Sequence, residues 1–271
     1  MQEFNRKVSK VFNFKADPDK VQTLLEGNIS VVSVANNHIG DFDKNGLLET
    51  IKVLDDAGIK PVGAGKNADQ ARSPIIIKKN GIKIGIFAFT DNEPGWEATK
   101  TVAGTNYISV GDIKYEQRFI DDVKKARENV DILIVSAHWG PNKREQPTPE
   151  FIKFAHSLIN AGVDIFHGHS AHIFQGIEIY KNKLIMYDTG DFIDDYMIYP
   201  DLRNDISFLF LVTVDRKKIK NVQFIPVLIS NMQVNLALGQ DFNWAADRIK
   251  KLSAPFGTKI MQKNNEIIVE M

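Results

Sequence analysis

Apolar and polar positions divide the first two thirds of the chain into two kinds of segment. Three short runs are almost continuously apolar, as in strands that are buried on both faces: residues 29–35, 130–137 and 164–167. Four other segments space their apolar residues as helices do: residues 17–27, 45–57, 112–129 and 149–161. Strands that alternate with helices predict an α/β domain built around a parallel sheet.

Hairpin signals appear once early in the chain and dominate its last third. Asn80-Gly81, between the apolar runs 75–79 and 82–89, is the strongest of them. Two later hairpins are predicted from paired strand-like runs: 173–180 with 184–187, and 207–214 with 219–228 around the charged turn 215–218. A helix over 242–252 and a strand over 267–270 end the chain. No repeat or linker interrupts the pattern, so we predict a single domain over residues 1–271.

Polar turns rich in histidine follow three of the predicted strands. They are Asn36-Asn37-His38, His138-Trp139-Gly140 and the stretch from His167 to His172, which holds three of the six histidines of the chain. A fourth strand-like run, 184–187, ends in Asp188-Thr189-Gly190-Asp191. Because the ends of neighbouring strands meet at one edge of a sheet, we expect these side chains to converge.

Converging histidine, asparagine and aspartate side chains suit a divalent metal ion. The chain has no cysteine, so only nitrogen and oxygen ligands are available, and these favour Mn, Fe or Zn. A single histidine is more often a structural residue than a ligand, but three within six residues favour a metal site. The remaining polar or aromatic residues of the turns are candidates for substrate binding, with packing the simpler interpretation for the tryptophan: Asn36, Trp139, His167 and Asp191.

Composition narrows the classes of partner. Hydrophobic residues make up 43% and charged residues 25% of the chain, as in ordinary globular proteins. Lysine plus arginine and aspartate plus glutamate both total 34, so nothing favours nucleic acid or an anionic membrane as a partner. No apolar run approaches the roughly 20 residues of a membrane span. As the chain is written, we expect a cytoplasmic protein, and a missing N-terminal signal or anchor would overturn that expectation.

The motifs, taken in order, resemble those of the bacterial poly-γ-glutamate capsule-synthesis proteins (CapA-type), a branch of the calcineurin-like metallophosphatase superfamily. The resemblance covers nearly the whole chain and rests on these blocks: Phe12-Asn13-Phe14, Ala16-Asp17-Pro18, Ala35-Asn36-Asn37-His38, Gly63-Ala64-Gly65, Thr90-Asp91-Asn92-Glu93-Pro94, His138-Trp139-Gly140, Gly168-His169-Ser170-Ala171-His172 and Tyr187-Asp188-Thr189-Gly190-Asp191-Phe192. It implies a layered sandwich of mixed β-sheets flanked by helices, here lacking the first strand region.

The resemblance also implies roles for individual residues. Asn37, His138, His169 and His172 correspond to metal ligands, and Asn37 also to a contact with a phosphoryl oxygen. His38 corresponds to the residue that protonates the leaving group, and Asp41 is expected to orient it. Two departures stand out: two residues instead of one separate His169 from His172, and Asp43 stands where glycine is expected.

A larger departure lies at the N-terminus. The Asp-x-His or Gly-Asp block of the superfamily, and the Asn-Leu-Glu block of the capsule branch, have no counterpart in residues 1–34. Those carboxylates hold the first metal ion and bridge the second. Their absence should weaken a two-metal centre severely, and a single bound ion is the alternative for this chain. Truncation is the first explanation; a natural single-metal variant and a non-catalytic relative are the others.

These observations lead to three hypotheses about function. The first is a metal-dependent hydrolase of the phosphoesterase type, linked to polyglutamate or capsule polymers and acting on a phosphoester or an anionic polymer. The second is a non-catalytic polymer-binding or assembly component with a degenerate metal site. The third is a hydrolase of γ-glutamyl bonds, which the sequence does not separate from the first. The polar loop 91–107 is either a lid over the site or an ordinary surface connection.

Overall fold

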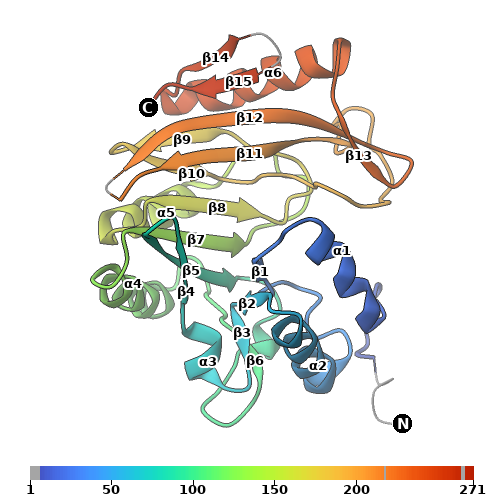
Figure 1. Ribbon diagram of the computed structural model, residues 1–271, viewed down its shortest axis with the longest axis vertical. Coiled ribbons are helices and arrows are strands. Elements are labelled where there is room, and N and C mark those ends of the chain that lie inside the picture. Colours follow the sequence, from blue (N-terminus) through green and yellow to red (C-terminus); the bar gives the residue numbers. More distant parts are fainter. Residues whose placement is uncertain (1–6, 217, 264–265) are drawn as a thin grey trace.

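A computed structural model describes residues 7–216, 218–263 and 266–271. The first six residues of the chain and Lys217, in the predicted turn 215–218, lie outside this range. Figure 1 shows a large layered unit of two sheets and a smaller N-terminal lobe, which lies beyond the ends of β5, β7 and β8. Within the described residues, no helix combines the length and apolar character needed to cross a bilayer.

The centre of the molecule is a six-stranded sheet whose four inner strands are parallel. Its order is β4 (Ile75–Lys79), β5 (Ile82–Thr90), β7 (Ile132–His138), β8 (Ile165–His169), β10 (Lys183–Met186) and β9 (Ile177–Tyr180). The edge strands β4 and β9 are antiparallel to their neighbours. The predicted turn at Asn80-Gly81 is confirmed: both residues have positive φ, 51° and 77°, as a two-residue hairpin turn requires.

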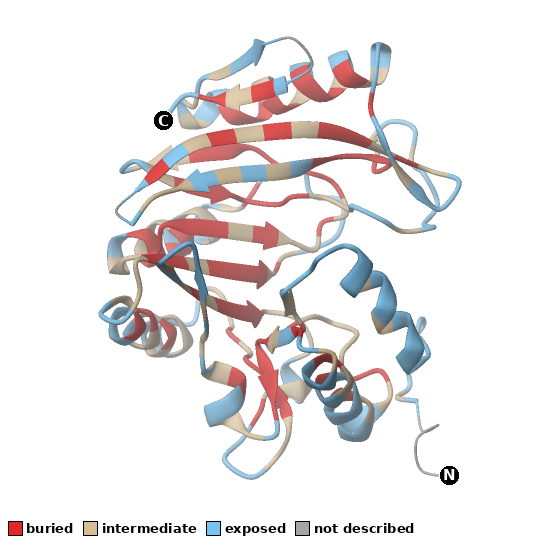
Figure 2. Cartoon of the chain, in the orientation of Figure 1, coloured by how far each residue is buried: buried red, intermediate tan, exposed pale blue. Residues whose placement is uncertain are grey.

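Two helices cover one face of this sheet, and the predicted bounds of both are nearly those observed. α4 (Ile113–Arg127) begins after Asp112, whose side chain accepts from Lys114 N, and α5 (Pro149–Ala161) begins after Thr148, whose side chain accepts from Phe151 N. The core beneath them is strongly aromatic, and its strand residues appear as buried in Figure 2. It includes Phe87, Phe89, Phe119, Phe154 and Phe166, all at most 2% exposed.

The other face packs against a second, antiparallel sheet. Its strands are β11 (Ile206–Val214), β12 (Ile219–Ser230), β13 (Gln233–Leu236), β14 (Ile260–Lys263) and β15 (Glu266–Val269), with helix α6 (Gln240–Ser253) packed beside them. Ile132, Leu184, Phe208 and Phe224 meet in the layer between the sheets. The architecture confirms the expected mixed α/β sandwich of sheets flanked by helices.

The contact between the sheets is open on one side. Among the described residues β11 pairs only with β12, so its other edge has no strand beside it. A cleft of about 530 Å³ lies there between the sheets, lined mainly by apolar side chains such as Ile84, Ile134, Phe210 and Val212.

The N-terminal lobe holds short elements around a small core of its own. These are η1 (Pro18–Lys20), α1 (Val21–Glu26), β1 (Val31–Ser33), α2 (Asp43–Asp56), β2 (Lys60–Val62), β3 (Ala64–Gly65), α3 (Ala68–Arg72) and β6 (Gly104–Thr105). Asp43 has a φ of 61°, the left-handed conformation that glycine adopts at least cost, which explains why glycine is expected there.

Two predicted strands are corrected. The run 29–35 gives only the three-residue strand β1, half-buried and paired with β2 rather than with the main sheet. Its partner contains Pro61, which has no N–H to donate to the ladder. The run 173–180 becomes a strand only at Ile177. Just before it, Gly176 passes so close to α6 that a Cβ there would lie 2.3 Å from the Leu252 carbonyl oxygen.

The loop after β5 is a folded connection. It contains η2 (Pro94–Trp96), and β6 pairs with β3 of the N-terminal lobe. The ring of Trp96 lies so close to Gly40 that a Cβ on that glycine would be 2.7 Å from it. The loop therefore links the sheet to the N-terminal lobe.

Asp164, just before β8, joins three elements at the edge of the sheet opposite the histidines. It is 3% exposed and accepts hydrogen bonds from Arg127 Nη1 (2.6 Å), Leu133 N (2.8 Å) and Lys183. Asp164→Ala leaves two cations without their shared partner, so we expect the free energy of unfolding to fall by roughly 3 to 5 kcal/mol. Urea denaturation measures the change.

The matched control is Asp56→Ala, which removes an exposed ion pair with Lys52 within α2. It should change the free energy of unfolding little. Equal losses in the two variants would contradict the role given to Asp164.

Candidate functional site

The parallel register of β7 and β8 places two histidines side by side at the carboxyl end of the sheet. His138 and His169 are direct partners across the strands, and Ser136 and His167 are partners two residues earlier. All four side chains share the face that looks toward the second sheet, since alternate residues of a strand point the same way. The Nδ1 atoms of His138 and His169 are 3.2 Å apart.

A chain of hydrogen bonds fixes which ring nitrogen of His169 carries a lone pair. The Thr189 hydroxyl donates to the Gly168 carbonyl (3.1 Å), so its oxygen accepts from His167 Nε2 (3.2 Å). His167 Nδ1 then accepts from the Ser136 hydroxyl (3.1 Å), whose oxygen accepts from His169 Nε2 (3.2 Å). The proton of His169 is thereby placed on Nε2, and the lone pair on Nδ1 faces His138.

Burial keeps these imidazoles neutral. It lowers the pKa of His138 and of His167 to about 4, and that of His169 well below its ordinary value. The positive charges of His172, His38 and Lys10 lower the pKa of His138 further, so these groups lie within electrostatic range of it. Neutral imidazole is the form that binds a metal ion.

The turn after β8 holds His172 through two aspartates. Buried Asp188 accepts from Ala171 N (2.8 Å) and Gly190 N (2.9 Å), and burial raises the pKa of its carboxyl to about 7. Asp191 accepts from His172 Nδ1 (2.9 Å), and this bond raises the pKa of His172. Gly168 has no alternative, because a Cβ there would lie 2.0 Å from the Tyr187 carbonyl oxygen. Asp191 therefore orients His172, whereas the sequence predicts a contact with substrate for it.

A second turn presents His38 from the N-terminal lobe. The side-chain oxygen of Asn36 accepts from the N–H groups of His38 and Ile39, both at 2.8 Å, and so is occupied in shaping the turn. Asp41, which is fully buried, lies 2.7 Å from His38 Nδ1, the contact expected from the sequence. His38 Nε2 remains for a ligand. Asn37 stands between them, with its backbone carbonyl accepting from Lys10.

The histidine pair fits part of a metal site. Ligand nitrogens at the usual distance of about 2.1 Å from zinc are roughly 3.0 to 3.4 Å apart, and His138 Nδ1 and His169 Nδ1 match that spacing. His138 Nε2 is buried without a hydrogen-bond partner. In the described part of the chain, however, no three His, Asp or Glu side chains converge closely enough to hold an ion as they stand.

Trp139 takes the packing role that the sequence favours for it over substrate binding. Trp139 points to the opposite face of β7, is 3% exposed, and donates its indole N–H to the Tyr187 carbonyl (2.9 Å), so it is a core residue. His167 is committed to Ser136 and Thr189 at the inner end of the cleft between the sheets.

Sequence reasoning missed four residues of the site. Ser136 lies two residues before His138, so strand alternation could have found it; Thr189 stands at a strand end, where Asp188 was noticed. Asp91 holds the His138 turn by accepting from Gly140 N at 3.1 Å, and burial raises its pKa to about 6. Lys10 comes from a segment with no clear pattern.

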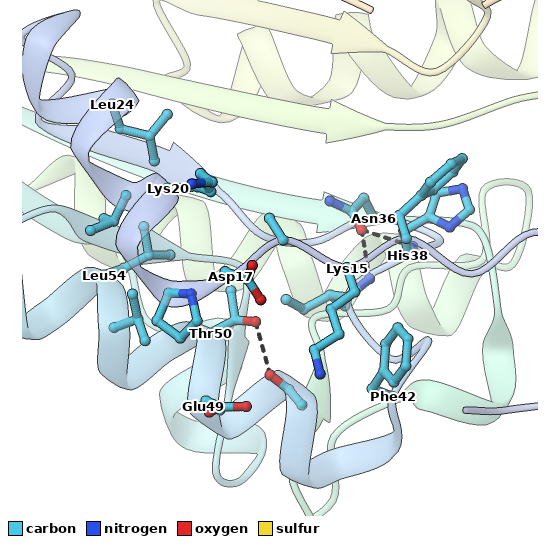
Figure 3. Close-up of a pocket in the computed structure, with 17 residues that line it drawn as sticks. Lys15, Asp17, Lys20, Leu24, Asn36, His38, Phe42, Glu49, Thr50 and Leu54 are labelled. Carbon is cyan, nitrogen blue, oxygen red and sulfur yellow. Dashed lines mark hydrogen bonds between the residues drawn. The ribbon is translucent and has the colours of Figure 1, made fainter. Parts of the chain in front are cut away.

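A pocket of about 620 Å³ opens beside His38, between α1 and α2. Figure 3 shows His38 and Asn36 at one end and Leu24 and Leu54 toward the other. Its apolar wall includes Val21, Leu24, Ile39, Val53 and Leu54, and charged residues at its rim include Lys15, Asp17, Lys20 and Glu49.

The family model described as bacterial capsule synthesis protein PGA_cap matches residues 2–196. The chain belongs to the PGA_cap family. All of the histidine-bearing turns described above lie within the matched residues, as do α1, α2 and the six-stranded sheet.

The names of two curated relatives agree with this assignment. A probable polyglutamine synthesis accessory protein of Mycobacterium tuberculosis is 32% identical over 269 residues, covering 94% of this chain and 70% of the relative. The capsule biosynthesis protein CapA of Bacillus anthracis is 30% identical over 191 residues, covering 70% of this chain and 46% of that protein. Among solved structures, a hypothetical protein from Thermus thermophilus is similar with a TM-score of 0.46 at 12% identity, covering 81% of this chain and 79% of that one.

The lowered pKa values of the histidines predict acid sensitivity in this PGA_cap chain. The folded-state pKa of His138 and His167, about 4, lies below the value near 6.5 of an unfolded chain, so the unfolded state binds more protons between these pH values. The free energy of unfolding, measured by urea denaturation in EDTA, should therefore fall as the pH drops from 6.5 to 4, by roughly 1 to 3 kcal/mol per histidine.

Two variants check the assignment in two pH ranges. His167→Gln should make the fall shallower. His172→Gln should act above pH 6.5 instead. The raised pKa of His172 gives the wild type stability that is fully present below pH 6.5 and is lost as the pH rises through that raised pKa, so the variant should lack this loss. A pH profile that neither variant changes would count against the stated protonation states.

Proposed function

We propose that this chain is a metal-dependent hydrolase of phosphoesters that acts in the metabolism of a capsule or polyglutamate type of polymer. The observation that carries the proposal is the 3.2 Å approach of two imidazole nitrogens, His138 Nδ1 and His169 Nδ1, at the carboxyl ends of β7 and β8. The polymer is suggested by the names of the PGA_cap relatives.

On the sheet side of the site, His138 and His169 would hold a divalent ion such as Mn, Fe or Zn, and His172, which the family resemblance gives as a ligand, would be a further nitrogen donor. A bound ion of this kind supplies a nucleophilic hydroxide and neutralises charge on a phosphoryl oxygen. Ser136 and His167 keep the His169 lone pair pointed at that position. Asp191 contacts Nδ1 of His172 at 2.9 Å and so fixes the orientation of that ring.

On the other side, His38 is the proton donor to the leaving group. Its Nδ1 is held by Asp41 at 2.7 Å, which fixes the ring and leaves Nε2 to carry the proton. Asn37, adjacent to His38, would contact a phosphoryl oxygen or the ion, the role that the family resemblance suggests for it. The pocket between α1 and α2 begins at His38 and offers room for the organic part of the substrate, whose aliphatic segments suit the wall formed by Leu24 and Leu54.

A second function is favoured by one observation: within the described chain no group of three donors is ready to hold an ion. A polymer-binding component with a degenerate metal site would show this. Elemental analysis of the purified protein separates the two, because the hydrolase should retain a transition metal and the binding component should not.

Activity is tested with Mn²⁺ and an aryl phosphate. The wild-type chain should release the phenol, and His169→Ala, which removes one of the two paired nitrogens, should lower kcat at least about 100-fold. Asp41→Asn should lower kcat by about 10 to 100-fold, because it removes the carboxylate that orients His38 and that also holds Lys10 and Phe14 N. Initial rates against substrate and Mn²⁺ concentration measure both effects.

His156→Gln is the matched histidine control. His156 lies on α5 and bonds to Glu178 (2.9 Å), away from the cluster, so its loss should leave the rate unchanged. Release that needs no metal, or that survives in His169→Ala, would exclude the proposed hydrolase.

A further inference from the structure

The residues before η1 form an arm that is tied to Asp41. Val8 N donates to the Asp41 carbonyl (2.9 Å), and Phe14 N donates to Asp41 Oδ2 (2.9 Å). The ring of Phe14 meets that of His38 edge-on, with centroids 4.4 Å apart. The arm therefore lies directly beside the proposed proton donor.

Lys10, on this arm, has its ammonium group in a pocket built for a cation. Nζ contacts Asp41 Oδ1 (3.1 Å), Glu93 Oε1 (3.4 Å) and the backbone carbonyl of Asn37. It also lies over the ring of Trp96, 4.8 Å from the centroid. Three oxygens and one aromatic face thus surround a single positive charge, and its side chain is only 19% exposed.

The surroundings are shaped to hold this arrangement. Glu93 has a φ of 55°, an uncommon conformation for a residue with a side chain. Trp96 can lie here only because Gly40 has no side chain. A strained backbone at Glu93 therefore brings a carboxylate to Lys10, and the absence of a side chain at Gly40 allows the ring of Trp96 to reach it.

Charge counting shows what Lys10 does. Asp41 and Glu93 supply two carboxylates on the Asn37–His38 side of the site, and Lys10 is the cation bonded to both. Without it, two carboxylates and a carbonyl would face each other, a set of oxygen ligands that suits Mg²⁺ or Ca²⁺. With it, the ammonium donates to the Asp41 carboxylate and to the Asn37 carbonyl, and pairs with the charge of Glu93.

We propose that Lys10 is a built-in cation that fills the oxygen-lined half of the site and confines metal binding to the imidazole half. Lys10 is a positioning residue: it neutralises the carboxylate that orients His38. This inference deepens the proposed function and rests on it, because the proposed function makes His138 and His169 the metal-binding, imidazole half of the site. It predicts one transition-metal ion per wild-type chain.

The test replaces the charge and asks whether a metal ion takes its place. Lys10→Met keeps an unbranched side chain as far as Cε and removes the ammonium, and should create a site for a hard cation. Mg²⁺ titrated by calorimetry should bind to Lys10→Met at least ten times more tightly than to the wild type. Tb³⁺ bound there should show emission sensitised by Trp96, and Trp96→Phe in the same background should remove that emission.

Three controls separate this role from a merely structural one. Lys10→Arg keeps a charge and should gain no site. Lys20→Met removes an exposed lysine that pairs with Asp19 near the same arm, and should gain none either. Adding Glu93→Gln to Lys10→Met should weaken the new site again at least ten-fold, which loosening of the arm would not explain.

The outcomes are distinguishable from those of the hydrolase test. Equal binding of Mg²⁺ and Tb³⁺ by wild type and Lys10→Met, or two Mn²⁺ ions per wild-type chain, would overturn the role of Lys10 even if aryl phosphate is hydrolysed. A gained oxygen site in Lys10→Met would support it even if no hydrolysis is found.

Discussion

The register between β7 and β8 is the constraint on which the site depends. His138 lies opposite His169 only because the two parallel strands pair in this alignment, and a shift by one residue would turn the imidazoles to opposite faces of the sheet. The same alignment brings Ser136 beside His167 and so completes the hydrogen-bond chain that places the His169 lone pair. One strand alignment thus determines both the pairing of β7 with β8 and the orientation of the His169 ring.

The site is shared between two parts that are stabilised differently. The imidazole half sits on strands buried between an aromatic core and a second sheet, where side chains have little freedom. The His38 half is carried by a small lobe with a modest core of its own, and an arm with little burial ties it together through Asp41. Regions with few buried contacts open more easily, so the His38 half is the part in which motion would first affect the geometry.

Much of this could be predicted from the sequence. Continuous apolar runs located β7 and β8, helical spacing located α2, α4 and α5, and Asn80-Gly81 located the first hairpin, because each signal is local. The gathering of histidines at strand ends was predicted from the parallel sheet, and the contact between His38 and Asp41 was expected from the resemblance to the capsule-synthesis family. Family membership came from the order of the motifs.

Other features were out of reach because they depend on tertiary neighbours. The core contact between Phe89 and Trp139 depends on which face of β7 the indole packs against. The short length of β1 depends on a proline in its partner strand. Asn36 was a candidate for substrate binding, but its side-chain oxygen accepts from backbone N–H groups of its own turn. Lys10 lies in a segment without periodicity, and only three-dimensional proximity to Asn37, Asp41 and Glu93 gives it meaning.

The polarity of the central sheet separates two edges of the molecule. All of the imidazoles of the cluster stand at or beyond the carboxyl ends of β7 and β8, whereas Asn80-Gly81, residues 128–131 and Lys181-Asn182 connect elements at the opposite edge. A spectroscopic label or an affinity handle inserted at these three connections would leave the histidines in place. A one-residue deletion in the histidine-bearing turns would displace them. The fold thus offers one edge for attachment and reserves the other for reaction.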